Sequence, residues 1–172
     1  EDKPSAVQTA ASQAARSPWY TEFVQRVVTP AVQDVGRYNS IAFNPHDNLP
    51  YISFYNAYTD NLVVASPVFA WGNLCDVNSN WWCQVVDGDG IEGRSTDDTG
   101  QYSSIAFWKG SGDETWKMGI SYYDATNKRL KYAWNDPAWH TEVVDSGGDV
   151  GQHTSLVLDG SGSPHIAYYD AK

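Results

Sequence analysis

The sequence has little methionine, cysteine or basic side chain, and it has no long apolar run. No apolar stretch approaches the roughly 20 residues that a membrane-spanning helix needs, so no transmembrane segment is expected. The 11 Lys and Arg residues face 21 Asp and Glu residues, and a net charge of −10 disfavours binding to nucleic-acid phosphates. One Met accompanies 14 Gly, 8 Trp and 11 Tyr. This balance favours strands over helices and predicts an all-β protein without a nucleic-acid partner.

The two cysteines are Cys75 and Cys83, with seven residues between them. In an oxidising compartment they would close a short loop, whereas in the cytosol they would remain thiols. The four histidines do not cluster near the pair, which disfavours a zinc site. The chain begins at Glu1 and not at Met, as it would after removal of a secretion signal. We therefore expect a disulfide and a secreted, periplasmic or cell-surface location.

Internal repetition is the most informative feature of the sequence. Three kinds of segment recur three times in the same order, and a fourth recurs twice. They are a Trp-led segment (19–25, 81–87 and 139–145), a Gly-x-Tyr/His-x-Ser segment (34–43, 98–107 and 149–158), an Ile-x-Tyr/Phe-Tyr segment (52–57, 120–125 and 166–171) and a Leu-x-x-Ala segment (62–65 and 130–133). Three aligned blocks in one order indicate a repeated structural unit.

Each recurring segment is short, rich in β-branched and aromatic residues, and bounded by turn residues, which is typical of strands. Apolar or small side chains occur on both faces of the predicted strands, as in a sheet that is covered on both sides. Radially stacked four-stranded sheets form β-propellers with about 4–8 blades. The sequence predicts a β-propeller of four-stranded antiparallel blades, of which about two and three-quarters are present, so that the ring is incomplete.

The repeats also predict how the chain is divided. We expect a fragment of a longer propeller, and the alternative is that partner chains supply the missing blades. The predicted parts are a flexible N-terminal lead-in (1–17), blade one (18–66), an insertion that carries Trp71 and Cys75 (67–80), blade two (81–134) and a partial blade three (135–172).

Three stretches carry a resemblance to known proteins: Gly151-x-His-x-Ser-Leu156, Asp159-Gly-Ser-Gly-x-Pro-His-Ile-Ala-Tyr-Tyr-Asp-Ala171 and Leu130-Lys-Tyr-Ala133. This pattern resembles the propeller repeats of secreted bacterial and archaeal proteins, which are broadly similar to sialidase-like and lectin-like propellers. The resemblance implies the fold and an extracytoplasmic location. The group is mostly without assigned function, so the resemblance implies no particular ligand.

The tryptophans fall into two classes. Trp19, Trp81 and Trp139 recur at one position of the repeat, which favours a role in the core. The others do not recur, so we expect them on loops or at the rim, where an aromatic face can stack on a sugar ring or anchor a protein partner. The candidate ligand-binding residues are Trp71, Trp82, Trp108 and Trp116.

Acidic residues concentrate in one glycine-rich stretch. Asp87, Asp89, Glu92 and Asp98 are candidate calcium ligands, because calcium prefers carboxylate oxygens on a bent loop. Their spacing departs from a dedicated calcium loop, and solvated turns are the alternative interpretation. Glu22, Gln84 and Glu142 occupy one repeat position and would line the central channel if the Trp-led strand is innermost.

No catalytic constellation stands out. The five arginines are scattered, and the sequence has no Gly-x-Ser-x-Gly elbow and no phosphate-cradling loop. We expect a non-catalytic recognition or scaffold module that acts through protein–protein contacts in a larger assembly or through glycan binding. The alternative is a fragment of a sialidase-like glycoside hydrolase.

Overall fold

The computed structural model describes residues 8–11, 20–24, 34–67, 73–76, 79–91, 94–110 and 112–172. Every strand pair in this part of the chain is antiparallel and no α-helix occurs in it, so the all-β class is confirmed. The strands are β1 (Gln8–Ala11), β2 (Tyr20–Phe23), β3 (Val35–Asn44), β4 (Leu49–Asn56), β5 (Asn61–Ser66), β6 (Asn73–Leu74), β7 (Trp82–Asp87), β8 (Thr99–Trp108), β9 (Lys117–Asp124), β10 (Arg129–Asn135), β11 (Trp139–Asp145), β12 (Val150–Leu158) and β13 (Pro164–Asp170).

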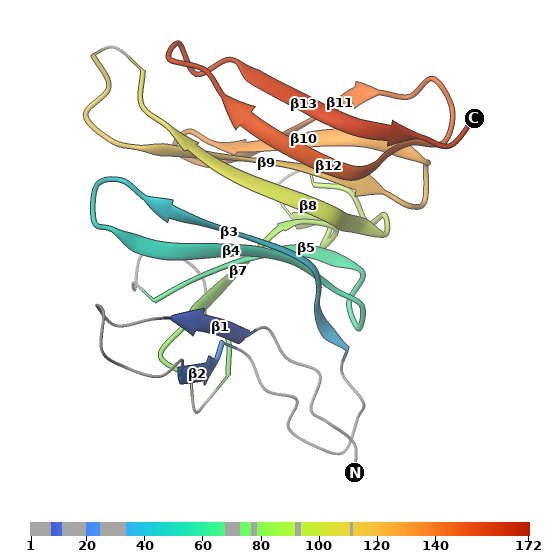
Figure 1. Ribbon diagram of the computed structural model, residues 1–172. Coiled ribbons are helices and arrows are strands. Elements are labelled where there is room, and N and C mark those ends of the chain that lie inside the picture. Colours follow the sequence, from blue (N-terminus) through green and yellow to red (C-terminus); the bar gives the residue numbers. More distant parts are fainter. Residues whose placement is uncertain are drawn as a thin grey trace.

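The strands form separate sheets that are stacked on one another (Figure 1). The first large sheet has the order β3-β4-β5-β7-β6 and the second has the order β8-β9-β10-β11. The pairs β1-β2 and β12-β13 form two-stranded sheets at the two ends of the stack (Figure 1). Strand β8 contacts β3 on one side and β12 on the other, so these three strands converge. A closed propeller ring is not formed by the described residues.

The strands are grouped differently from the predicted blades. The Trp-led strands β7 and β11 close the sheet that precedes them, because β7 pairs with β5 and β11 pairs with β10. Gln84 and Glu142 therefore lie on strands that other strands of their sheets separate from β3 and β8, and the condition under which they would line a central channel is not met. The stretch expected as a lead-in contains strand β1.

Two apolar clusters lie on opposite faces of the first large sheet. One fills the space between the two large sheets and includes Leu62, Val86 and Tyr122. The other includes Trp81 together with Val24, which directly follows β2. Trp81 is buried and Trp139 packs against the first cluster, so these two tryptophans belong to the core as predicted. Trp19 lies outside the described residues.

The glycine of the Gly-x-Tyr/His-x-Ser segment lets consecutive sheets approach closely. A Cβ atom on Gly100 would lie 2.6 Å from the Cα atom of Leu62, and a Cβ atom on Gly151 would lie 2.7 Å from that of Leu130. Both glycines have positive φ angles, which glycine adopts without strain. The same local structure thus recurs where β8 meets the first sheet and where β12 meets the second.

Cys75 and Cys83 form a disulfide, as predicted. It connects the residue that follows β6 to β7, and these two strands also pair with each other. The disulfide therefore fixes the edge of the first large sheet to the insertion. Within the described ranges no helix has the length and apolarity required to cross a membrane.

Candidate functional site

Trp108 and Trp116 lie in one shallow pocket of about 230 Å³ between two hairpins. Trp108 ends β8 and Trp116 immediately precedes β9, so both flank the loop that joins these strands. The opposite side of the pocket is formed by Leu158, Asp159 and Gly160 of the β12–β13 hairpin. Two of the tryptophans predicted to be rim residues are thus brought together at the boundary between two sheets.

The Trp108 ring lies against the β12–β13 hairpin. A Cβ atom on Gly162 would come within 2.3 Å of Trp108 Cδ1, so the indole lies against bare backbone of the β12–β13 hairpin. Gly162 also has a φ of +84°, a conformation that favours glycine. Phe107, the residue before Trp108, packs edge-on against Tyr51 of the first sheet, with ring centroids 5.2 Å apart.

Asp159 supplies an ordered negative charge to the pocket. Its carboxylate accepts hydrogen bonds from the Ser161 hydroxyl at 2.6 Å and from the backbone N–H groups of Ser161 and Ser163 at 2.8 and 3.0 Å. These bonds, the Ser161 hydroxyl first, hold the pKa of Asp159 well below its ordinary value. Lys109 also lines the pocket. The site therefore combines two indole rings with an ionised acceptor and an ammonium donor.

The other two candidate tryptophans do not join this pocket. Trp82 begins β7, is half-buried, and lies opposite Ser66 on one side and Leu74 on the other. It is next to the disulfide and does not line the tryptophan pocket. Trp71 lies outside the described residues.

The candidate calcium ligands are distributed among partners within the chain. Asp87 is fully buried, pairs with the Lys131 ammonium and accepts a hydrogen bond of 2.8 Å from the Tyr122 hydroxyl. Asp89 accepts two hydrogen bonds from Arg94, at 2.8 and 3.0 Å.

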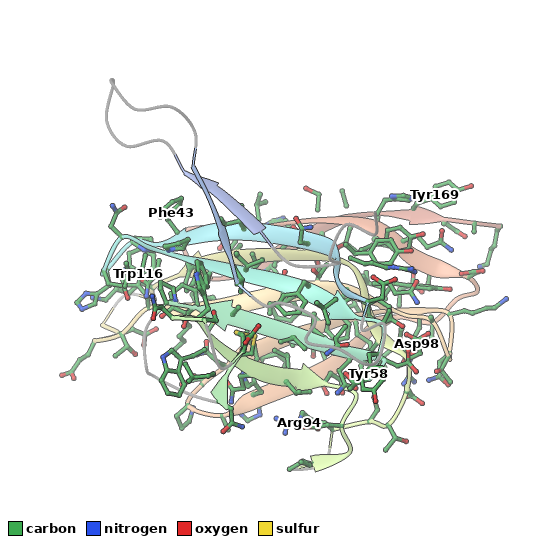
Figure 2. The ribbon with its side chains drawn as sticks, turned by 90° about the horizontal axis from the view of Figure 1, so that it is seen from below. Phe43, Tyr58, Arg94, Asp98, Trp116 and Tyr169 are labelled. Atoms are coloured by element: carbon green, nitrogen blue, oxygen red, sulfur yellow. A yellow bond between two sulfur atoms is a disulfide. The ribbon has the colours of Figure 1, made fainter. Side chains whose placement is uncertain are left out.

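Asp98 accepts weak bonds of 3.4 Å from the Gln101 amide, and Glu92 lies outside the described residues. Among the residues described, no three His, Cys, Asp or Glu side chains are grouped so that they could hold a metal ion. The two candidate sites are also far apart, since Asp98 and Trp116 lie at opposite ends of the strands (Figure 2).

The buried centre at Asp87 was not anticipated from the sequence. Burial raises the pKa of the Tyr122 hydroxyl well above its ordinary value, so Tyr122 stays a hydrogen-bond donor to Asp87. A signal was present, because Lys131 interrupts an apolar strand and a buried lysine requires a carboxylate. This centre holds the two large sheets together and is closed to ligands.

Comparison with known proteins adds no relative: no family model matches the chain, and no curated protein matches it.

Proposed function

We propose that the chain is a non-catalytic, extracytoplasmic β-propeller module that binds glycans at the pocket of Trp108 and Trp116. The convergence of these two tryptophans between the β8–β9 and β12–β13 hairpins carries the proposal. Neither tryptophan recurs in the other repeats, so the propeller packing does not require them.

The pocket has the chemistry that a sugar ring needs. A pyranose presents C–H groups on its faces, which stack on aromatic rings, and hydroxyl groups at its rim, which need donors and acceptors. The indoles of Trp108 and Trp116 offer the aromatic surface, and Asp159 and Lys109 offer an acceptor and a donor. A shallow pocket of this size accommodates a terminal or bent sugar unit and leaves the rest of a glycan in solvent.

The carboxylate content of the pocket favours binding over hydrolysis. Glycosidases use a pair of carboxylates, about 5–9.5 Å apart according to the mechanism. Asp159 is the one carboxylate among the described residues that line the pocket, and its lowered pKa makes it a poor general acid. A sialidase-like hydrolase is therefore the weaker alternative.

The propeller architecture and the location have separate support. A five-stranded and a four-stranded antiparallel sheet are stacked, with β3, β8 and β12 converging, and this arrangement is consistent with consecutive blades around an axis. The Cys75–Cys83 disulfide is consistent with a secreted, periplasmic or cell-surface protein.

A glycan array followed by titration calorimetry tests the proposal. Trp108→Ala and Trp116→Ala should each weaken binding at least about tenfold, or about 1.4 kcal/mol. Trp134→Ala is the matched control, since Trp134 stacks on Tyr132 and His140 in the second sheet and does not line the pocket. Absence of glycan binding, with and without calcium, would contradict the proposal, and turnover of a glycoside would favour the hydrolase.

A further inference from the structure

The small sheet β1-β2 has the register of the last two strands of a large sheet. Thr9 lies opposite Glu22, just as Tyr132 lies opposite Glu142 and Val64 lies opposite Gln84. Glu22, Glu142 and Gln84 each lie three residues after the Trp that begins their repeat segment, namely Trp19, Trp139 and Trp81. Strands β1 and β2 therefore correspond to β10 and β11, and they form the second half of a four-stranded unit.

The small sheet β12-β13 is the matching first half. Leu156 lies opposite Ile166, as Ile105 lies opposite Ile120 in the pair β8–β9 and Ile41 lies opposite Ile52 in the pair β3–β4. Both pairs also contain the same register shifts near the Gly-x-Tyr/His motif. The two ends of the stack thus carry complementary halves of one unit.

Burial shows which surface lacks its cover at the β13 end. Tyr122 of β9 is fully buried, whereas the equivalent Tyr168 of β13 is 39% exposed. Val86 of β7 is fully buried against the next sheet, whereas the equivalent Val144 of β11 is 46% exposed. In the large sheets a third strand beside β4 or β9 provides this cover, and β13 has no such neighbour in the described chain.

The opposite face of the stack has the complementary exposure. Ile105 and Leu156 are buried against the sheet that precedes them, while Ile41 at the same position of β3 is 53% exposed. Phe43 is exposed beside it, and Figure 2 shows Phe43 and Tyr169 at the periphery of the molecule. The exposed face of β3 therefore lacks a strand pair like β12-β13 packed against it. The exposed face of β12 lacks a next sheet that would begin with a strand like β3.

A hydrogen-bond pattern between consecutive sheets specifies how these faces would fit. Ser40 Oγ accepts from the N–H of Ile105 at 3.2 Å, and Ser104 Oγ accepts from the N–H of Leu156 at 3.0 Å. The next acceptor in this series is Ser155 on the exposed side of β12, and the equivalent donor is the N–H of Ile41 on β3.

A second bond runs in the opposite direction in each step. Ser103 Oγ donates to the Tyr38 carbonyl at 2.8 Å, and Thr154 Oγ1 donates to the Tyr102 carbonyl at 2.7 Å. The next acceptor in this series is the carbonyl of His153, and the equivalent donor is the side-chain amide of Asn39, one N–H of which already donates to the Gly36 carbonyl at 3.0 Å. The two faces thus offer matched donors and acceptors as well as apolar surface.

We infer that two copies of this chain associate head to tail, with β1-β2 of each copy completing the β12-β13 sheet of the other. Strands β12 and β13 would continue into β1 and β2 of the second copy, and Val157 would pack against the second copy's β3 face. Two copies supply six converging strands, which lies within the about 4–8 blades of closed propellers, whereas three copies would exceed it. The inference rests on the propeller architecture proposed above but not on its glycan site.

Native mass spectrometry and light scattering of the 172-residue chain give the first test. We expect twice the 19.1 kDa chain mass at micromolar concentration. A monomer, or an open series of larger masses, would overturn the inference. Glycan binding is read separately by the array, so failure of one proposal is distinguishable from failure of the other.

A cross-link tests the predicted pairing of β13 with β1 of the second copy. In the large sheets Ser121 lies opposite Tyr132 and Ser53 opposite Val64, so Ala167 should lie opposite Thr9 of the second copy. Thr9→Cys combined with Ala167→Cys should give a covalent dimer on a non-reducing gel. The control combines Ala11→Cys with Ala167→Cys, which is two residues out of register and should not link. Equal linking by both pairs of cysteines, or a link within one chain, would contradict the head-to-tail association.

A charge placed on the β12 face provides an independent measurement. Val157→Asp should raise the dimer dissociation constant at least about 100-fold, because the carboxylate would be buried without a partner. Ile91→Asp is the matched control: Ile91 is 58% exposed and Val157 is 62% exposed, but Ile91 lies in the loop after β7. Equal dissociation constants for the two variants would overturn the inference.

Discussion

The same aspartate–tyrosine contact occurs at two boundaries of the stack in very different surroundings. Asp87 accepts a hydrogen bond of 2.8 Å from Tyr122 between the two large sheets, and we call this contact the closed joint. Asp145 accepts a bond of 2.6 Å from Tyr168 between the second large sheet and the β12-β13 pair, and we call this contact the open joint. The closed joint is buried and also holds the Lys131 ammonium, whereas the open joint is exposed.

The comparison separates two contributions of the repeat. The hydrogen bond forms in both joints. It therefore depends only on the Asp at the end of a Trp-led strand and on the Tyr in the second strand of the next sheet. Burial differs, because the strand that covers Tyr122 is β10, and β13 has no equivalent neighbour in the described chain. The repeated sequence therefore determines whether the Asp–Tyr hydrogen bond forms. A further strand beside the Tyr determines whether the bond is buried, and so how much it contributes to stability.

The largest effect should come from removing the acid of the closed joint. Asp87→Ala should destabilise the fold by about 3–5 kcal/mol, because it leaves the Lys131 ammonium buried without a counter-charge. Asp145→Ala should cost far less, since Asp145 and its partners are solvated. Chemical denaturation of dilute protein measures both free energies of unfolding.

The double variant Asp87→Ala with Lys131→Met is the control for this interpretation. It should recover part of the loss, because an apolar side chain replaces the unpaired ammonium. Equal costs for Asp87→Ala and Asp145→Ala would show that burial does not distinguish the joints. When the measurement is repeated at protein concentrations where the proposed dimer forms, the costs of Asp87→Ala and Asp145→Ala should become more similar, because the second copy would then cover the open joint.

A smaller effect is expected from filling the space beside Tyr132, on the face of the second large sheet opposite to the closed joint. A Cβ atom on Gly119 would lie 2.2 Å from the Tyr132 hydroxyl, so Gly119→Ala must displace that ring and should cost about 2 kcal/mol. His165 occupies the equivalent position of β13 and is exposed, and His165→Ala should change stability by less than about 0.5 kcal/mol. Thermal unfolding of both variants provides the measurement, and similar losses would contradict the comparison.

The repeats in the sequence predicted the strands well but not how they group. The segment from Ile120 forms β9, and the segments from Leu62 and Leu130 form β5 and β10. The predicted blade boundaries fall inside the observed sheets, because a period does not define where a unit begins. The short link after Asn135 favours a hairpin between β10 and β11, and this signal could have corrected the grouping.

Other features depended on long-range placement. Strand β1 was missed because Val7-Gln-Thr-Ala10 shares little more than its alanine with Leu-Lys-Tyr-Ala. Trp108 and Trp116 could be singled out because they do not recur. Asp159 and Gly162 could not be assigned to them, since only the stacking of two sheets brings the second hairpin to these rings.

The smallest expected effect concerns high pH. Burial of the Tyr132 hydroxyl, together with the charge of Glu142, raises its pKa to about 12 from an ordinary value of 10.0. The stability that this hydroxyl contributes is complete below pH 10, where Tyr132 is protonated in both states. It is lost as the pH rises from 10 through 12, because the unfolded chain ionises first. Tyr132→Phe should therefore flatten the decline of unfolding free energy over this interval, measured by denaturation at several pH values.

Tyr168→Phe at the open joint should change the slope less, since the hydroxyl of Tyr168 is solvated and its raised pKa comes mainly from the bond to Asp145. An equal change of slope in both variants would mean that the burial of the Tyr132 hydroxyl does not govern the alkaline response.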